Sequence, residues 1–186
     1  MRKAPLHPGG RETTLRLLEM AEKYGLPSGK RCALDMGAGA GGTLRLLREL
    51  GWEADGIDRN PGDGVSVGDL LCTSFPDKTF DLVISECSFY VAGDVAGALR
   101  EAWRLLKKNG LLALGDVYFG SPGEWRETLE RQSFRVLEME DITDLWREYY
   151  LECVWMGRTE VLCHGHRKGC RYFLTVARNQ GKIKVT

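Results

Sequence analysis

The sequence has no excess of charge of either sign and no long apolar run. Its 186 residues include 26 Lys and Arg and 26 Asp and Glu, so no net field attracts nucleic acid or an anionic membrane. No run approaches the roughly 20 apolar residues that cross a bilayer. The first residues, MRKAPLHPGG, are partly basic but lack the apolar core of a signal peptide. We therefore expect a cytoplasmic protein with no membrane contact, and nucleic acid is a disfavoured partner.

The chain also lacks regular cysteine spacing, an internal repeat and a low-complexity linker. Four of its six cysteines, Cys32, Cys72, Cys87 and Cys153, are scattered through expected helices and strands, which favours free thiols in a reducing compartment. The length suits one domain, and 43% apolar residues are enough for a folded core. We expect residues 1–186 to form a single domain, and the sequence leaves its oligomeric state open.

What is present is a regular alternation of strand and helix patterns. Apolar residues at helical spacing mark residues 12–24, 42–51, 94–110, 123–132 and 144–156. Strand patterns mark residues 31–36, 52–58, 64–70, 79–85, 111–118, 134–140 and 170–178. Such alternation predicts an α/β fold, a Rossmann-like doubly wound sheet that is mostly parallel and has helices on both faces.

The stretch ALDMGAGAGG, residues 33–42, is an apolar strand that runs into a glycine-rich turn. Gly37, Gly39 and Gly42 satisfy the GxGxxG spacing of dinucleotide enzymes, and Gly37, Gly39 and Gly41 equally satisfy a GxGxG pattern. In open α/β sheets, ligands bind beyond the carboxyl ends of the strands. The turn therefore predicts a nucleotide-containing cofactor without choosing between NAD and S-adenosylmethionine.

Three acids at expected strand ends narrow this choice. Asp35 lies two residues before Gly37, where a carboxylate opposes a pyrophosphate and favours the cationic sulfonium and ammonium of S-adenosylmethionine. Alternatively, Asp35 only accepts hydrogen bonds from the backbone of the turn and contacts no ligand. Asp58 can accept hydrogen bonds from both ribose hydroxyls, a feature shared with NAD enzymes that does not separate the two cofactors. Asp69 can accept a hydrogen bond from an adenine amino group, or it is a turn residue after Gly68.

In order and spacing, the segments LDMGAGAGG, GIDRNP, GDL, FPDKTFDLVIS and LREAWRLLKKNGLLAL resemble the successive motifs of class I S-adenosylmethionine-dependent methyltransferases. The likeness is greatest to the ubiquinone/menaquinone-biosynthesis-type branch. The resemblance implies a seven-stranded sheet whose last strand is antiparallel. It also implies a cofactor-binding core over residues 7–120, with substrate-side helices and the last strands over residues 121–186.

The resemblance further implies the roles of individual residues. The HPGG segment, residues 7–10, resembles the part of this branch that folds over the cofactor. The resemblance implies that Asp35, Gly37, Ala38 and Gly39 contact the methionine end of the cofactor and that Asp58 contacts the ribose. It also implies that Arg59, Asp69 and Leu70 contact the adenine, and that Glu86 and Cys87 lie near the transferred methyl group. The segment SECSFY departs from the family, which commonly has a small residue, Asn, Asp or His where Glu86 and Cys87 stand.

Methyl transfer from a sulfonium is a direct displacement that leaves S-adenosylhomocysteine. The enzyme mainly aligns the acceptor and excludes water, and an oxygen or nitrogen acceptor must also lose a proton to a base. We take Glu86 and Tyr90 as candidate catalytic residues, with Tyr118 and His7 as further candidate bases. Each has a structural alternative: a salt bridge or helix cap for Glu86, and packing for the tyrosines.

The leading hypothesis is thus a methyltransferase acting on a small molecule whose identity and acceptor atom stay open. A non-catalytic protein that keeps the S-adenosylmethionine pocket is the first alternative. A nicotinamide- or flavin-linked oxidoreductase that uses the GxGxxG match is the second, and Asp35 and the later motifs count against it.

A separate cluster, CHGHRKGC, contains Cys163, His164, His166 and Cys170. These side chains suit zinc, but their spacing fits no standard finger, so we expect an exposed turn and assign no metal. Basic residues also gather here and beyond, which keeps a local anion or nucleic-acid contact open as the minor interpretation.

Overall fold

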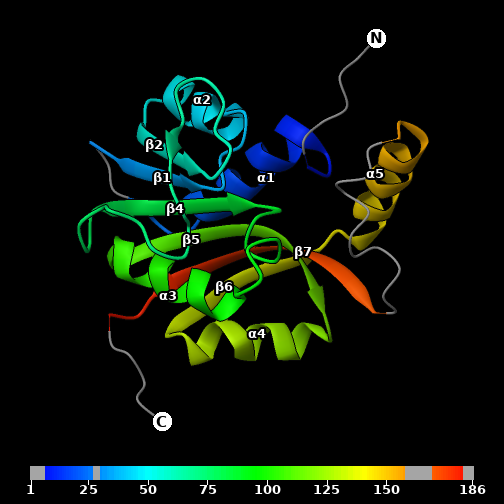
Figure 1. Ribbon diagram of the computed structural model, residues 1–186. Coiled ribbons are helices and arrows are strands. Elements are labelled where there is room, and N and C mark those ends of the chain that lie inside the picture. The colour runs from blue at the N-terminus through cyan, green and yellow to red at the C-terminus, as the bar shows by residue number, and fades with distance from the viewer. Residues whose placement is uncertain (1–6, 27–29, 158–168, 182–186) are drawn as a thin grey trace.

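The computed structural model describes residues 7–26, 30–157 and 169–181. Within them, seven strands form one sheet in the order β3-β2-β1-β4-β5-β7-β6 (Figure 1). The first five strands pair in parallel, and β7 is antiparallel to both β5 and β6. This confirms the predicted fold with its antiparallel last strand. The strands are β1 Cys32–Met36, β2 Glu53–Asp58, β3 Ser66–Val67, β4 Phe80–Glu86, β5 Leu106–Phe119, β6 Phe134–Asp141 and β7 Cys170–Asn179.

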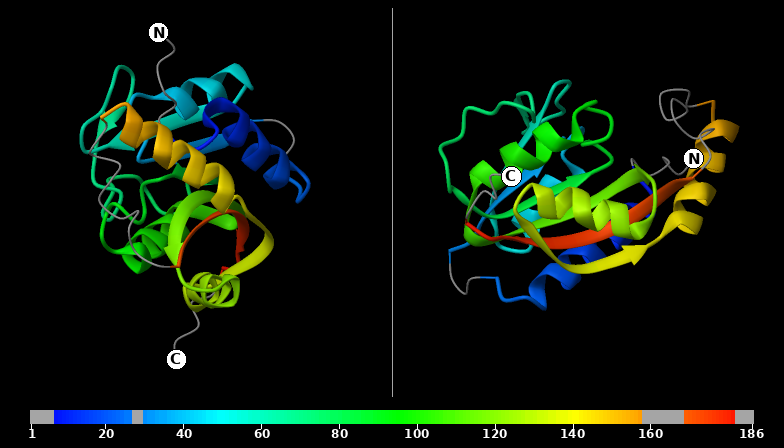
Figure 2. Two further views of the ribbon diagram at one scale, coloured as in Figure 1. Left: turned by 90° about the vertical axis from the view of Figure 1, so that its right-hand side faces the viewer. Right: turned by 90° about the horizontal axis from the view of Figure 1, so that it is seen from below.

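Helices cover both faces of the sheet, as Figures 1 and 2 show. The helices are α1 Gly10–Glu22, α2 Gly42–Glu49, α3 Val95–Leu105, α4 Pro122–Arg131 and α5 Thr143–Trp155. One core holds side chains of α1, α2 and the first turn of α5, and the other holds those of α3 and α4. Because strand side chains alternate, neighbours such as Ala33 and Leu34 enter opposite cores. Over the described ranges, no helix is long and apolar enough to span a membrane.

The helix predicted over residues 94–110 is shorter than its sequence suggests. Asp94 caps it as predicted, accepting a hydrogen bond from the Gly97 amide at 2.7 Å, but α3 ends at Leu105. The carbonyls of Arg104 and Leu105 accept the amides of Lys78 and Thr79, both at 2.9 Å. These partners replace the next helical turn, and the chain enters β5 at Leu106.

The predicted third strand, residues 64–70, is reduced to the two exposed residues of β3. Asp69 ends it, because its Oδ1 accepts the Leu71 amide at 2.9 Å and its carbonyl accepts the Cys72 amide at 3.0 Å. This turn removes the chain from the edge of the sheet. The remaining predicted elements are present, with ends that differ by a few residues.

Candidate functional site

Two adjoining pockets open where β1, β2 and β4 end. The chain moves from the edge strand β3 back to β4 here, so this is the switch point at which open α/β sheets bind ligands. The larger pocket has a volume of about 540 Å³ and the smaller one about 350 Å³, and Gly37, Cys87 and Ser88 line both. All residues lining these two pockets lie between His7 and Ala92.

The glycine turn forms the floor between the pockets. The amides of Gly37 and Ala38 both donate to the carbonyl of Ile57 at 2.9 Å, which ties the turn to β2. Gly37 has φ +87°, and a Cβ there would lie 2.1 Å from the Ser88 Oγ, so glycine is required. Gly39 has φ +49°, and a Cβ there would meet no described atom within 4 Å. A ligand can therefore approach the backbone at Gly39 closely.

Asp35 is buried in the wall of the larger pocket, with 3% of its surface exposed. The backbone amide of Leu44 donates to its carboxyl group, but Oδ2 has no hydrogen-bond partner among the described residues. Burial raises the pKa of this carboxyl well above its usual value, and the nearby Glu86 carboxylate raises it further. A buried acceptor without a partner is costly, so this wall suits a cationic group that supplies a donor.

Residues around Asp58 form the smaller pocket. Asp58 Oδ2 accepts the Gly39 amide at 2.9 Å and Oδ1 accepts the Asn60 amide at 2.8 Å, so this carboxylate joins the ends of β1 and β2. Arg59 and Leu70 also line the pocket. Asp69 is not among its lining residues. It pairs with Arg59 at 2.9 Å and accepts the Leu71 amide, and both contacts lower its pKa.

Glu86, the last residue of β4, lies at the centre of a polar cluster in the larger pocket. Its Oε2 accepts the hydroxyls of Thr14 and Thr43, each at 3.0 Å, and the His7 Nδ1 lies 3.4 Å from Oε1. Burial raises the pKa of Glu86, and His7 and the two threonines partly offset this rise. Sequence reasoning missed both threonines. The available signals were a hydroxyl on the apolar face of α1 and another in the first turn after the glycines.

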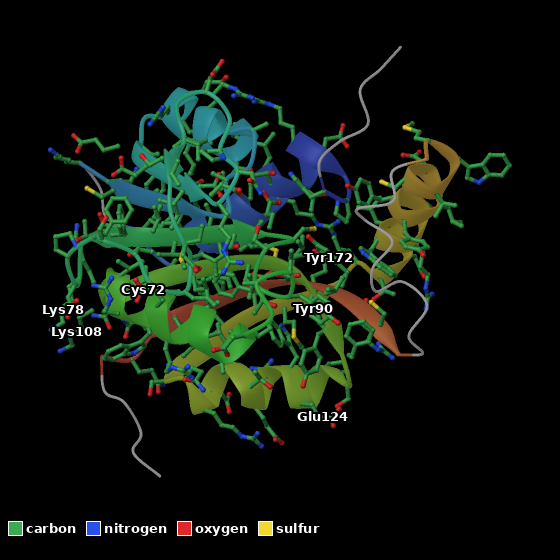
Figure 3. All side chains as sticks on the ribbon, viewed as in Figure 1. Cys72, Lys78, Tyr90, Lys108, Glu124 and Tyr172 are labelled. Carbon is green, nitrogen blue, oxygen red and sulfur yellow. The ribbon has the colours of Figure 1, made fainter. Side chains whose placement is uncertain are left out.

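The remaining candidate residues are Cys87, Tyr90 and Tyr118. The Cys87 Sγ lies 3.2 Å from the Tyr172 hydroxyl, and burial raises the pKa of the Cys87 thiol well above its usual value, so the thiol stays protonated. Tyr90 packs its ring 5.2 Å from that of Phe119 and lines neither pocket. The Tyr118 ring lies 4.8 Å from the ring of Trp125 in α4, in the core that contains α3 and α4. Figure 3 shows Tyr90 and Tyr172 right of centre, whereas Lys78 and Lys108 lie at the left-hand end.

Of the cysteine and histidine cluster, only Cys170 belongs to the described residues. It begins β7, is 7% exposed, and has a thiol pKa that burial raises to about 11. Cys163, His164 and His166 lie outside the described ranges, so the metal question stays a prediction.

Comparison with known proteins shows a family to which part of this chain is similar. The sequence profile of a family described as "Methyltransferase domain" matches residues 34–114, which include the glycine turn and the strand ends described above. Residues 34–114, somewhat less than half of the chain, are therefore similar to this methyltransferase domain family. The narrower ubiquinone/menaquinone branch is not confirmed, because the relatives are varied methyltransferases.

Two curated relatives illustrate that variety. The sarcosine/dimethylglycine N-methyltransferase of Halorhodospira halochloris is 28% identical over 78% of this chain and 65% of that protein. The arsenite methyltransferase of Aquipseudomonas alcaligenes is 40% identical over 28% of this chain and 15% of that protein. The chain thus spans less than two thirds of the length of either relative.

A solved structure has the same fold at low sequence identity. The phosphoethanolamine N-methyltransferase 2 of Haemonchus contortus, in complex with S-adenosyl-L-methionine, superposes with a TM-score of 0.75 at 17% identity. The match covers 95% of this chain and 54% of that one.

Proposed function

We propose that the chain is an S-adenosylmethionine-dependent methyltransferase of a small molecule. The observation that carries the proposal is the Oδ2 atom of Asp35, a buried acceptor in the pocket wall with no partner among the described residues. An ammonium or sulfonium group is attracted to this wall, where Glu86 adds a second carboxyl group. A pyrophosphate would meet two acids there, which disfavours the oxidoreductase alternative.

We assign the larger pocket to the methionine end of the cofactor and the smaller pocket to its adenosine end. The motif resemblance and the pocket linings support this division. The residues assigned to the methionine end are Asp35, Gly37, Ala38 and Gly39, with Glu86 and Cys87 beside the methyl group. Those assigned to the adenosine end are Asp58 for the ribose and Arg59 and Leu70 for the adenine. Asp69, which lines neither pocket, is assigned to the adenine on the motif resemblance alone.

When bound, the cofactor supplies a methyl group that its sulfonium has already activated for direct displacement. The residues of the chain then bind and orient the acceptor and exclude water from the pocket. We propose Glu86 as the group that takes the proton of an oxygen or nitrogen acceptor, because burial raises its pKa and it lines the larger pocket. Thr14 and Thr43 hold its carboxylate, and His7 lies beside it. Tyr90 stays a second catalytic candidate.

The acceptor is proposed only as a small molecule, since the relatives are named for acceptors as different as arsenite and dimethylglycine. We propose residues 7–120 as the cofactor core and residues 121–186 as the substrate side of one domain. In support, both pockets draw on the first region, and α5 lies on the side toward which β4 points in Figure 1. Membership of the ubiquinone/menaquinone branch rests on the ordered motifs.

A cytoplasmic location without a nucleic-acid partner belongs to the same proposal. Its support is the equal number of acidic and basic residues and the described cysteines, which are all free thiols. Retention of the protein on an RNA or DNA column at physiological salt would overturn the second part.

The decisive experiment is parallel calorimetric titration with S-adenosylmethionine, S-adenosylhomocysteine and NAD. We expect the first two to bind and NAD not to bind. Binding of NAD alone would refute the assignment of Asp35 and favour an oxidoreductase. Radiolabelled methyl transfer to a panel of small amines, phenols and thiols then separates an enzyme from a non-catalytic binding protein, which would bind the cofactor and label none of them.

A further inference from the structure

Asp116, near the carboxyl end of β5, lies outside every motif discussed so far. It is 2% exposed. Its Oδ2 accepts the amides of Phe89 at 2.8 Å and Tyr90 at 3.2 Å, the Ser88 amide also donates to its carboxyl, and Oδ1 accepts the Val117 amide at 2.7 Å. Three consecutive amides of the segment after β4 therefore converge on one carboxyl group.

That segment forms the wall which the two pockets share. Cys87 and Ser88 line both pockets, and the Ser88 Oγ donates to the carbonyls of Glu86 and Gly37, at 3.0 and 3.3 Å. Cys87 has φ +55°, a left-handed conformation that costs a non-glycine residue about 1 kcal/mol. The wall thus has a backbone conformation that local preference disfavours, and contacts from elsewhere in the fold must hold it.

We propose that Asp116 is a positioning residue of the cofactor site, whose carboxylate holds the Ser88–Tyr90 backbone in place and whose ionisation tunes the affinity for the cofactor. The nature of the ligand rests on the proposed function. The positioning role rests on the hydrogen bonds and burial of Asp116 itself.

The electrostatic surroundings support a role near neutral pH. Burial raises the pKa of Asp116 to about 6, although its four amide donors favour the charged form. The titratable groups that interact with it are Cys87 after β4, and Cys170 and Tyr172 of β7. Glu86 lies on the neighbouring strand β4, where it pairs with Gly115. The two thiols and the phenol have raised pKa values and stay neutral, and burial also raises the pKa of Glu86.

Protonation changes what Asp116 can do. A protonated carboxyl carries an O–H group and accepts more weakly, so it holds three converging amides less well. A cationic cofactor also favours the ionised form through the low-dielectric interior. Both effects weaken cofactor binding as the pH falls below about 6.

The first test needs no ligand. Hydrogen–deuterium exchange of the amides of Ser88, Phe89 and Tyr90 is compared at pH 7.5 between the wild-type protein and Asp116→Asn. The variant places an NH2 or a single weaker acceptor opposite these donors, and we expect at least fivefold faster exchange. Unchanged protection in a folded variant would overturn the positioning role.

Asp141→Asn is the matched control. Asp141 accepts the Thr143 amide at 2.9 Å and pairs with Arg171 at 2.8 Å at the start of α5, and it lines neither cofactor pocket. Its substitution should leave exchange at residues 88–90 unchanged. If Asp116→Asn does not fold, wild-type exchange at pH 5 and pH 7.5 is compared after correction for intrinsic rates. Protection must then fall at pH 5, and constant protection would overturn the proposal.

The second test measures S-adenosylhomocysteine affinity by calorimetry between pH 5 and pH 8. If only the ionised form binds, wild-type Kd rises about tenfold from pH 7.5 to pH 5, because the pKa is about 6. Asp116→Asn should bind about tenfold more weakly at pH 7.5 and show a flatter profile. An unchanged profile in the variant would assign the effect to Glu86 and overturn the ionisation role. Wild-type protein that binds no S-adenosylhomocysteine would refute the proposed function, while the exchange test still decides the positioning role.

Discussion

Asp58 shows how one carboxylate serves both the fold and the site. Its two oxygens already accept the amides of Gly39 and Asn60, and the residue still lines the smaller pocket. Each carboxylate oxygen can accept more than one hydrogen bond, so ribose hydroxyls can be added without breaking the contacts between β1 and β2.

Replacing Asp58 with Ala should therefore weaken S-adenosylhomocysteine binding at least 100-fold. The loss combines hydrogen bonds to a charged acceptor, worth about 1.5–3 kcal/mol each, with a loosened glycine turn. Calorimetric titration measures it. Asp55→Ala is the control, because Asp55 lies exposed on the same strand away from both pockets, and its affinity should equal that of the wild type. Wild-type affinity in Asp58→Ala would refute the ribose assignment.

At the scale of elements, α4 has the most complete local signals in the sequence. Ser121 accepts the Glu124 amide at 3.2 Å, Glu124 accepts the Ser121 amide at 2.7 Å, and Pro122 occupies the first turn. These contacts form a capping box. The helix is then anchored by Trp125, whose indole N–H donates to Thr175 of β7 at 3.0 Å in the core.

Replacing Ser121 with Ala should lower the free energy of unfolding by about 1 kcal/mol, because the first-turn amides lose their side-chain acceptor. Urea denaturation followed by circular dichroism measures this loss. Ser74→Ala serves as a control at an exposed loop serine and should have no effect. Equal stability of the two variants would show that the capping box contributes nothing here.

At the scale of the whole molecule, three buried carboxyl groups gather at one end of the sheet. Asp35, Glu86 and Asp116 all have pKa values raised first by burial. The folded chain therefore holds protons that the unfolded chain has already released, and raising the pH favours unfolding in this range. Groups with lowered pKa values, such as Asp69 and Asp141, act in the opposite sense but only below about pH 4.

The free energy of unfolding should consequently fall between pH 5 and pH 7. Asp116, with a pKa that rises from 3.8 to about 6, accounts for about 1 kcal/mol of this fall. Urea titrations at pH 5, 6 and 7 test this prediction. The free energy of unfolding should change less with pH in Asp116→Asn than in the wild type. Stability that rises over the interval would contradict the assigned direction of these pKa values.

The proposed site was predictable from sequence where its residues are neighbours along the chain. The four residues assigned to the methionine end all line the larger pocket, because a strand, an acid and a glycine turn follow one another within residues 33–42. Thr14 and Asp116 were not predictable in the same way. They meet their partners across 72 and 27 residues of sequence, and no local pattern specifies such a meeting.

Local patterns along the chain predicted the succession of strands and helices and the position of the glycine turn, because periodicity and turn chemistry act over a few residues. The antiparallel last strand was predicted from the family resemblance. The end of α3, in contrast, depends on packing, because the amides of Lys78 and Thr79 from another segment donate to the carbonyls of its last residues. Packing also brings Thr14 and Thr43 to Glu86, and Asp116 to the amides of the segment between the pockets. Burial and convergent hydrogen bonds arise only when distant segments pack together.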